Sequence, residues 1–135
     1  MGNKFKIKPQ VPATPSVVRA SVNLVFGFAE LRPLSYVNAG KDGKFFIQYL
    51  ERLKKLSGID WNTVNTSGRH SFGMEKMMVK NLTTSAKQLV PAGMDSLIVL
   101  RATGDNHAFL GYREGNVFQV IFIEYQFGDV YCHNH

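Results

Sequence analysis

Residues 96–133 consist of short apolar segments separated by turns in which glycine stands next to aspartate or asparagine. The segments SLIVLRA, HAFLGYR, VFQVIFIEY and VYCH alternate with TGDN, EGN and QFGD. Short runs rich in β-branched and aromatic residues, joined by such pairs, are typical of consecutive antiparallel hairpins. The pattern therefore predicts a four-stranded antiparallel meander at the carboxyl end, and this constrains the fold more than any other feature.

The preceding residues predict helices and an extended N-terminal segment. In KFFIQYLERLKKLSG (44–58), apolar residues recur at three- and four-residue spacing, which predicts the main helix. Asp60 is placed to cap a short helix through WNTVNTS, and LTTSAKQL predicts another. Residues 16–31 predict a strand, and residues 1–16 predict a basic, proline-containing arm. We expect one α+β domain over residues 17–135.

Composition narrows the classes of protein to consider. The chain has 135 residues, of which 44% are hydrophobic, and no apolar run approaches the ~18 residues of a membrane span. The first residues lack a secretory apolar core, and one cysteine excludes an internal disulfide framework, so we expect a cytoplasmic protein. The net charge of +6 is compatible with binding nucleic acid or an acidic protein, and equally with general solubility.

The turn lengths predict a strand register, if each turn has two central residues. Tyr112 is then opposite Gln119, and Leu110 is opposite Ile121, on an aliphatic face that should pack on the main helix. The other face carries Phe109 and Phe122, with polar residues at its edges. These polar residues are His107, Arg113, Glu124, Tyr131 and His133.

This set supplies the groups for cleaving RNA without a metal. The RNA 2′-hydroxyl can serve as nucleophile, so the protein needs a base, an acid and a cation for the phosphate charge. His107 or His133 would be base or acid, and Glu124 would tune them. Arg113 would hold the phosphate, and Tyr131 would position or stack on a base. Arg52, Lys54 and Lys55 on the helix, with Arg69 and His70 on a loop, would bind nucleic acid.

Two other interpretations remain open. His107, Glu124 and His133 on adjacent strands could hold a divalent ion, but no tight ligand motif supports this, and we expect neither metal nor cofactor. Alternatively, the aromatic face could be a non-catalytic docking surface for protein or nucleic acid. A second layer could also cover it as ordinary core.

The main helix followed by the meander resembles the RelE-like toxins of bacterial toxin–antitoxin systems, within the wider microbial-ribonuclease group. The similarity covers roughly residues 44–133 and is one of pattern, particularly the hairpin LGYREGNVFQVIFIEY. It implies cleavage of messenger RNA, often on the ribosome, and neutralisation by a partner antitoxin. It makes Arg113, Tyr131 and His133 positional candidates for the active site. The longer chain and its N-terminal region depart from the family and leave open a phage or mobile-element accessory protein that only binds.

Overall fold

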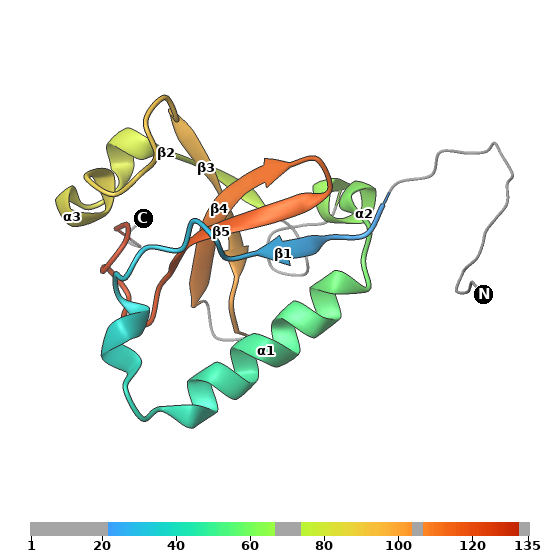
Figure 1. The fold of residues 1–135 in the computed structure, drawn as a ribbon, viewed down its shortest axis with the longest axis horizontal. Helices are drawn as coiled ribbons and strands as arrows, with labels where there is room; N and C mark the ends of the chain where they lie inside the picture. The colour runs from blue at the N-terminus through green and yellow to red at the C-terminus, as the bar shows by residue number, and fades with distance from the viewer. Residues whose placement is uncertain (1–21, 67–73, 104–106, 133–135) are drawn as a thin grey trace, which may run out of the picture.

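The computed structural model describes residues 22–66, 74–103 and 107–132, which form an α+β fold with one five-stranded mixed sheet (Figure 1). The predicted arm at residues 1–16 lies outside these residues. The strands are β1 (Val25–Gly27), β2 (Glu75–Met78), β3 (Ser96–Arg101), β4 (Ala108–Glu114) and β5 (Val117–Ile123). The helices are α1 (Gly43–Ser57), α2 (Trp61–Thr66) and α3 (Thr84–Lys87), with 3-10 turns η1 (Tyr36–Ala39) and η2 (Val79–Asn81).

The sheet has the order β1-β5-β4-β3-β2, which differs from the predicted meander at both edges. Strands β3, β4 and β5 are consecutive and antiparallel, as predicted. β1 pairs with β5 in parallel, and β2 lies beside β3. The predicted fourth strand, VYCH, is not a strand over its described residues. Its only sheet-like pairing there is an isolated bridge between Tyr131 and Leu82. None of the helices in the described ranges is long and apolar enough to cross a membrane.

α1 forms where the apolar spacing predicts it. Its buried residues are Phe45, Tyr49, Leu53 and Leu56, which recur at the spacing of one helix face. The Asp42 side chain caps its first turn by accepting a hydrogen bond from the Phe45 N–H at 3.1 Å. The predicted cap of α2 is also confirmed, since Asp60 accepts from the Thr63 N–H at 2.7 Å.

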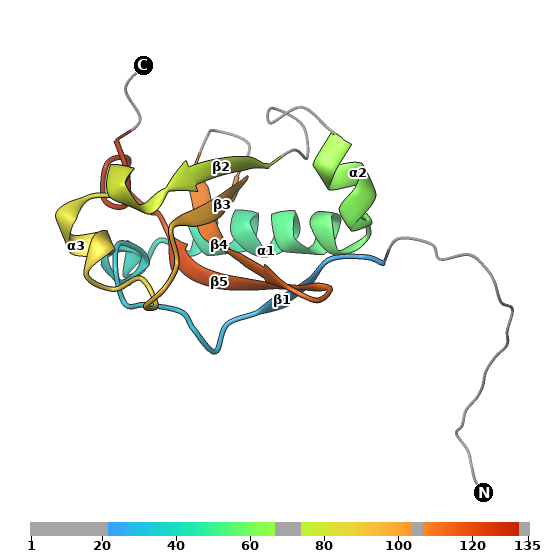
Figure 2. The same cartoon turned by 90° about the horizontal axis from the view of Figure 1, so that it is seen from above.

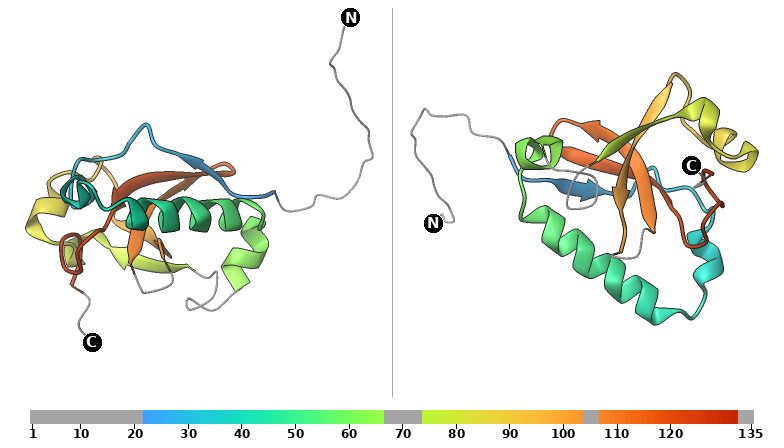
Figure 3. Two further views of the ribbon diagram at one scale, coloured as in Figure 1. Left: turned by 90° about the horizontal axis from the view of Figure 1, so that it is seen from below. Right: turned by 180° about the vertical axis from the view of Figure 1, so that it is seen from behind.

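Two apolar cores lie on the two faces of the sheet. On one face, the buried side of α1 packs with Phe109, Phe118 and Val120. On the other, Leu82 and Ala86 at α3 pack with Val130 and other residues of the C-terminal segment. Figure 3 shows α1 crossing one face, and Figure 2 shows α2 and α3 at opposite ends of the molecule. The prediction that α1 packs on the aliphatic face was wrong: the helix covers the face that carries Phe109, whereas Phe122 lies in the core on the other face.

A β-bulge in the central hairpin explains why Phe122 left the predicted aromatic face. Near the turn the register is as predicted, with Tyr112 opposite Gln119 and Arg113 opposite Phe118. The register then shifts between Leu110 and Gly111, so that Leu110 lies opposite Phe122 instead of Ile121. Gly111 is needed here, because a Cβ atom would clash with the carbonyl oxygen of Gln119. One extra residue on β5 reverses the side-chain parity of everything that follows it.

Candidate functional site

The bulge separates the predicted site residues His107 and Glu124. The prediction placed them opposite each other on one face. In the structure, the Glu124 N–H donates to the Ala108 carbonyl at 2.9 Å, and its side chain lies on the α3 side. His107 instead contacts the Phe45 ring on the α1 side, with 5.3 Å between ring centroids. Glu124 is fully buried and accepts hydrogen bonds from the N–H groups of Val130 and Tyr131, away from the Phe45 ring that His107 contacts.

Arg113 and Tyr131, two other predicted catalytic residues, do not line the hollow that contains His107. Arg113 lies at the far end of β4, about 20 Å away at the rise of an extended strand. Its guanidinium stacks on the Trp61 ring, 4.3 Å from the centroid. Tyr131 is buried in the core on the α3 side, where burial raises the pKa of its hydroxyl. His133 lies outside the described residues.

The predicted nucleic-acid-binding residues also lie in different places. Arg52 and Lys55 line one hollow beside α1. Lys54 is exposed on the same helix but does not line that hollow. Arg69 and His70 lie outside the described residues. Arg52 and Lys55 are therefore the two of these residues that line a common hollow.

His107 lines a hollow of about 380 Å³ at the N-terminal end of α1, which we call the His107 hollow. Its ring stands edge-on to Phe45 and lies 4.9 Å from the half-exposed ring of Phe127, tilted by 35°. The Nδ1 atom is 3.2 Å from the Thr103 hydroxyl oxygen. The complete lining is Asp42, Lys44, Phe45, Gln48, His107, Tyr125 and Gln126. The hollow thus combines a histidine, a lysine, aromatic edges and two amides.

Asp42 and Tyr125 form a hydrogen-bonded pair at this hollow. The Tyr125 hydroxyl donates to Asp42 Oδ2 at 2.7 Å. This bond, with the one from the Phe45 N–H, lowers the pKa of the Asp42 carboxyl, and the same bond to Asp42 raises the pKa of the Tyr125 hydroxyl. At neutral pH the pair is therefore a carboxylate with a protonated phenol. This fixes the Tyr125 ring against Phe45, with 4.9 Å between centroids.

Ser35 holds the turn that carries Tyr125 and Phe127. Its hydroxyl donates to Asp129 Oδ2 at 2.6 Å and accepts from the Tyr125 N–H at 2.7 Å. Ser35 is buried and has φ 72° and ψ −66°, and the Tyr36 N–H bonds to the Leu34 carbonyl across it. These features define a γ-turn with positive φ, a strained conformation for a residue other than glycine. The strained residue Ser35 therefore holds Tyr125, which lines the His107 hollow.

A second hollow of about 380 Å³ follows along α1 and is lined by Gln48, Glu51, Arg52, Lys55 and Thr103; we call it the Arg52 hollow. Gln48 lines both hollows. The Thr103 hydroxyl lines the second and contacts His107, which lines the first. The Arg52 Nε–H donates to the Arg101 carbonyl at 3.2 Å, and partial burial lowers the pKa of its guanidinium, which stays protonated at neutral pH. The two hollows are therefore neighbours, with the His107–Thr103 contact between them.

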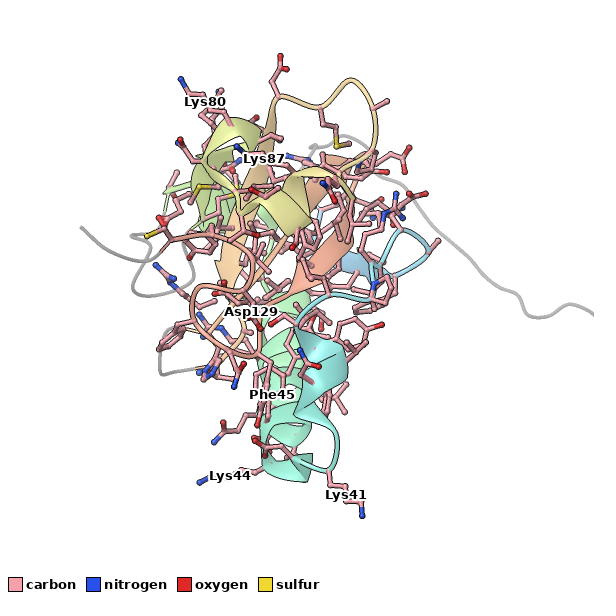
Figure 4. All side chains as sticks on the ribbon, turned by 90° about the vertical axis from the view of Figure 1, so that its left-hand side faces the viewer. Lys41, Lys44, Phe45, Lys80, Lys87 and Asp129 are labelled. Carbon is pink, nitrogen blue, oxygen red and sulfur yellow. The ribbon has the colours of Figure 1, made fainter. Side chains whose placement is uncertain are left out.

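Polar residues along α1 connect the two hollows. Lys44, Gln48, Arg52 and Lys55 are spaced by four, four and three residues, and each one precedes a buried residue of the helix. Figure 4 shows Lys41 and Lys44 at the N-terminal end of α1. Lys80 and Lys87 lie at the opposite end of the molecule in this view. Lys44 and Gln48 were not predicted as site residues, although their helical spacing to Arg52 was a usable signal. Asp42, Thr103, Tyr125 and Phe127 were not predicted either, and the last three come from segments distant from α1 in the sequence.

Within the described ranges, no group of three or more His, Cys, Asp or Glu side chains could hold a metal ion. His133, the third residue of the predicted metal set, lies outside these ranges. No family model matches this chain, and neither a curated protein nor a solved structure shows significant similarity to it. Function is therefore inferred from the two hollows and the residues that line them.

Proposed function

We propose that this protein binds single-stranded RNA along α1 and cleaves it there without a metal, with His107 as the base. The observation that carries the proposal is the position of His107. It lines the His107 hollow and contacts Thr103, which lines the Arg52 hollow, beside a helix face that carries Lys44, Arg52 and Lys55. A strand lying across both hollows would bring a phosphodiester to the imidazole.

The chemistry uses groups that line the hollows. His107 would take the proton of the RNA 2′-hydroxyl, whose oxygen attacks the adjacent phosphorus. Lys44 and Arg52 would stabilise the charge that develops on the phosphate oxygens. The bond from phosphorus to the 5′-oxygen breaks, and the Lys44 ammonium would protonate that oxygen. The products are a 2′,3′-cyclic phosphate and a 5′-hydroxyl.

The biological setting follows from the resemblance to RelE-like toxins. By that resemblance, the substrate would be messenger RNA, on or off the ribosome, in the cytoplasm. A small acidic antitoxin protein would neutralise the activity. The chain's positive charge favours both an RNA substrate and an acidic partner.

A second candidate function is a non-catalytic interaction module. The observation that favours it is an apolar strip on the solvent side of α1, where Ile47 is 59% and Leu50 is 63% exposed. Exposed apolar residues grouped on one face often mark a protein contact. A phage or mobile-element accessory protein would use such a surface without cutting RNA.

The two functions differ in their response to salt and to loss of lysines. We would titrate the full chain into a labelled, single-stranded 2′-O-methyl RNA, which cannot be cleaved, over a range of salt concentrations. We expect affinity to fall as salt rises, with the slope reduced by roughly 1.4 in a Lys44→Ala/Lys55→Ala variant, at about 0.7 per lost phosphate contact. Lys80→Ala/Lys87→Ala is the matched control at the other end of the molecule (Figure 4). Absence of RNA binding, or equal effects of both double variants, would contradict RNA binding at α1.

A further inference from the structure

We infer that the two hollows are subsites for two consecutive unpaired nucleotides of one RNA strand, with the connecting phosphodiester at His107. This inference rests on the proposed function and makes it more specific. Each hollow has a volume of about 380 Å³, which is within the range of small-molecule sites. They share Gln48, and the 3.2 Å contact between His107 and Thr103 joins their walls.

The His107 hollow has the features of a nucleobase site. Phe127, which lies beside the lining residue His107 without lining the hollow itself, is 55% exposed, and an exposed aromatic ring can stack on a base. The side-chain amides of Gln48 and Gln126 line the same hollow, and an amide can both donate to and accept from the edge of a base. A paired base has its edge occupied and its faces stacked, so this site selects an unpaired strand.

The Arg52 hollow has a different lining that suits the neighbouring nucleotide. Arg52 and Lys55 supply two cations and Glu51 supplies one carboxylate. A guanidinium plane can stack on a base, and both cations can contact phosphate. From Lys44 to Arg52 the helix rises about 12 Å, which spans both hollows.

Stacking and base contacts, more than charge, favour a nucleic acid over an acidic peptide as the occupant. Three basic residues, Lys44, Arg52 and Lys55, line the hollows along with two acidic ones, Asp42 and Glu51. The Asp42 carboxylate is occupied by the Tyr125 hydroxyl and the Phe45 N–H. The excess of positive charge is small, so most of the affinity must come from stacking and base contacts, which a peptide carboxylate does not provide.

The test is competition for the full chain bound to a labelled 2′-O-methyl RNA hexamer. The competitors are a dinucleoside monophosphate with a 2′-O-methyl group, a nucleoside monophosphate, inorganic phosphate, and a dinucleotide that lacks one base. We expect the dinucleotide to compete best and removal of a base to weaken it by about fivefold or more, the range for loss of one base stack. Phe127→Ala should weaken dinucleotide binding by a similar factor. Phe28→Ala, which removes another exposed ring, is the matched control.

The outcomes separate this inference from the proposed function. If the hexamer binds but the mononucleotide and the dinucleotide lacking a base compete as well as the intact dinucleotide, the two-nucleotide site is wrong and RNA binding stands. Equal affinities for wild type and Phe127→Ala would also contradict it. If the hexamer does not bind, the proposed function fails and this inference fails with it.

Discussion

The Glu124 carboxylate accepts a hydrogen bond of 2.9 Å from the Val130 N–H inside the core. The same oxygen accepts from the Tyr131 N–H at 3.3 Å, and Glu124 has no exposed surface. These bonds close the turn after β5, which is also the turn that carries Tyr125 and Phe127 to the His107 hollow. Glu124 therefore supports the candidate site through the backbone, without facing it.

Replacing Glu124 should destabilise the fold strongly. Glu124→Ala would leave two buried N–H groups without an acceptor and create a cavity, so we expect the free energy of unfolding to fall by roughly 3 kcal/mol. Glu114→Ala, at an exposed carboxylate on β4, should change it by less than about 0.5 kcal/mol. Urea denaturation of both variants measures the difference, and equal midpoints would show that the Glu124 bonds contribute little.

Ser35 should tolerate glycine better than alanine. Both changes remove the hydroxyl that bonds to Asp129 and Tyr125, but only glycine relieves the positive φ, a strain of about 1–3 kcal/mol. We therefore expect Ser35→Gly to unfold at a higher temperature than Ser35→Ala, with both below wild type. If the alanine variant were the more stable, backbone strain at this turn would be refuted.

Tyr49→Phe should stabilise the protein. The Tyr49 hydroxyl is buried under α1 and has no hydrogen-bond partner within the described ranges, and burial raises its pKa. Removing an unsatisfied buried hydroxyl while keeping the ring, which packs edge-on to Phe109, should raise the free energy of unfolding by about 1 kcal/mol. A fall in stability on this change would mean that the hydroxyl is bonded in solution.

Asp42→Asn should make the melting temperature less sensitive to pH in the acidic range. The Asp42 carboxyl has a lowered pKa in the folded state, so its charged form stabilises the fold above the unfolded pKa of about 3.9. That contribution is lost as pH falls through the folded value. We expect wild type to melt above the variant near neutral pH, with the gap closing at pH values below about 3.9. A gap that stays constant across this range, followed by circular dichroism, would argue against a lowered pKa.

Regular patterns in the sequence predicted the main elements well. The apolar spacing of α1, the Asp60 cap and the Gly115-Asn116 turn between β4 and β5 are local signals, and each is confirmed. The parallel pairing of β1 with β5 was not predictable in this way, because it joins segments about ninety residues apart through three residue pairs.

The bulge separated residues that the predicted site had placed on one face of the sheet. Ile121 and Phe122 are both apolar, and both are buried in the core on the α3 side. The hydrophobic pattern therefore gave no sign that two residues of β5 occupy one position. Because register sets side-chain parity, this single insertion moved Glu124 to the opposite face from His107. His107 remains a candidate because it precedes β4 and reaches the end of α1.

The most direct test of the account is RNA cleavage by wild type, His107→Ala and Arg113→Ala in the presence of a chelator. Labelled single-stranded RNA should yield fragments ending in 2′,3′-cyclic phosphate with wild type and with Arg113→Ala, since Arg113 lies at the far end of β4. His107→Ala should bind the RNA but cleave it at about one hundredth of the wild-type rate or below, which is the usual effect of losing a general base. Absence of cleavage by wild type, or wild-type rates from His107→Ala, would contradict the account.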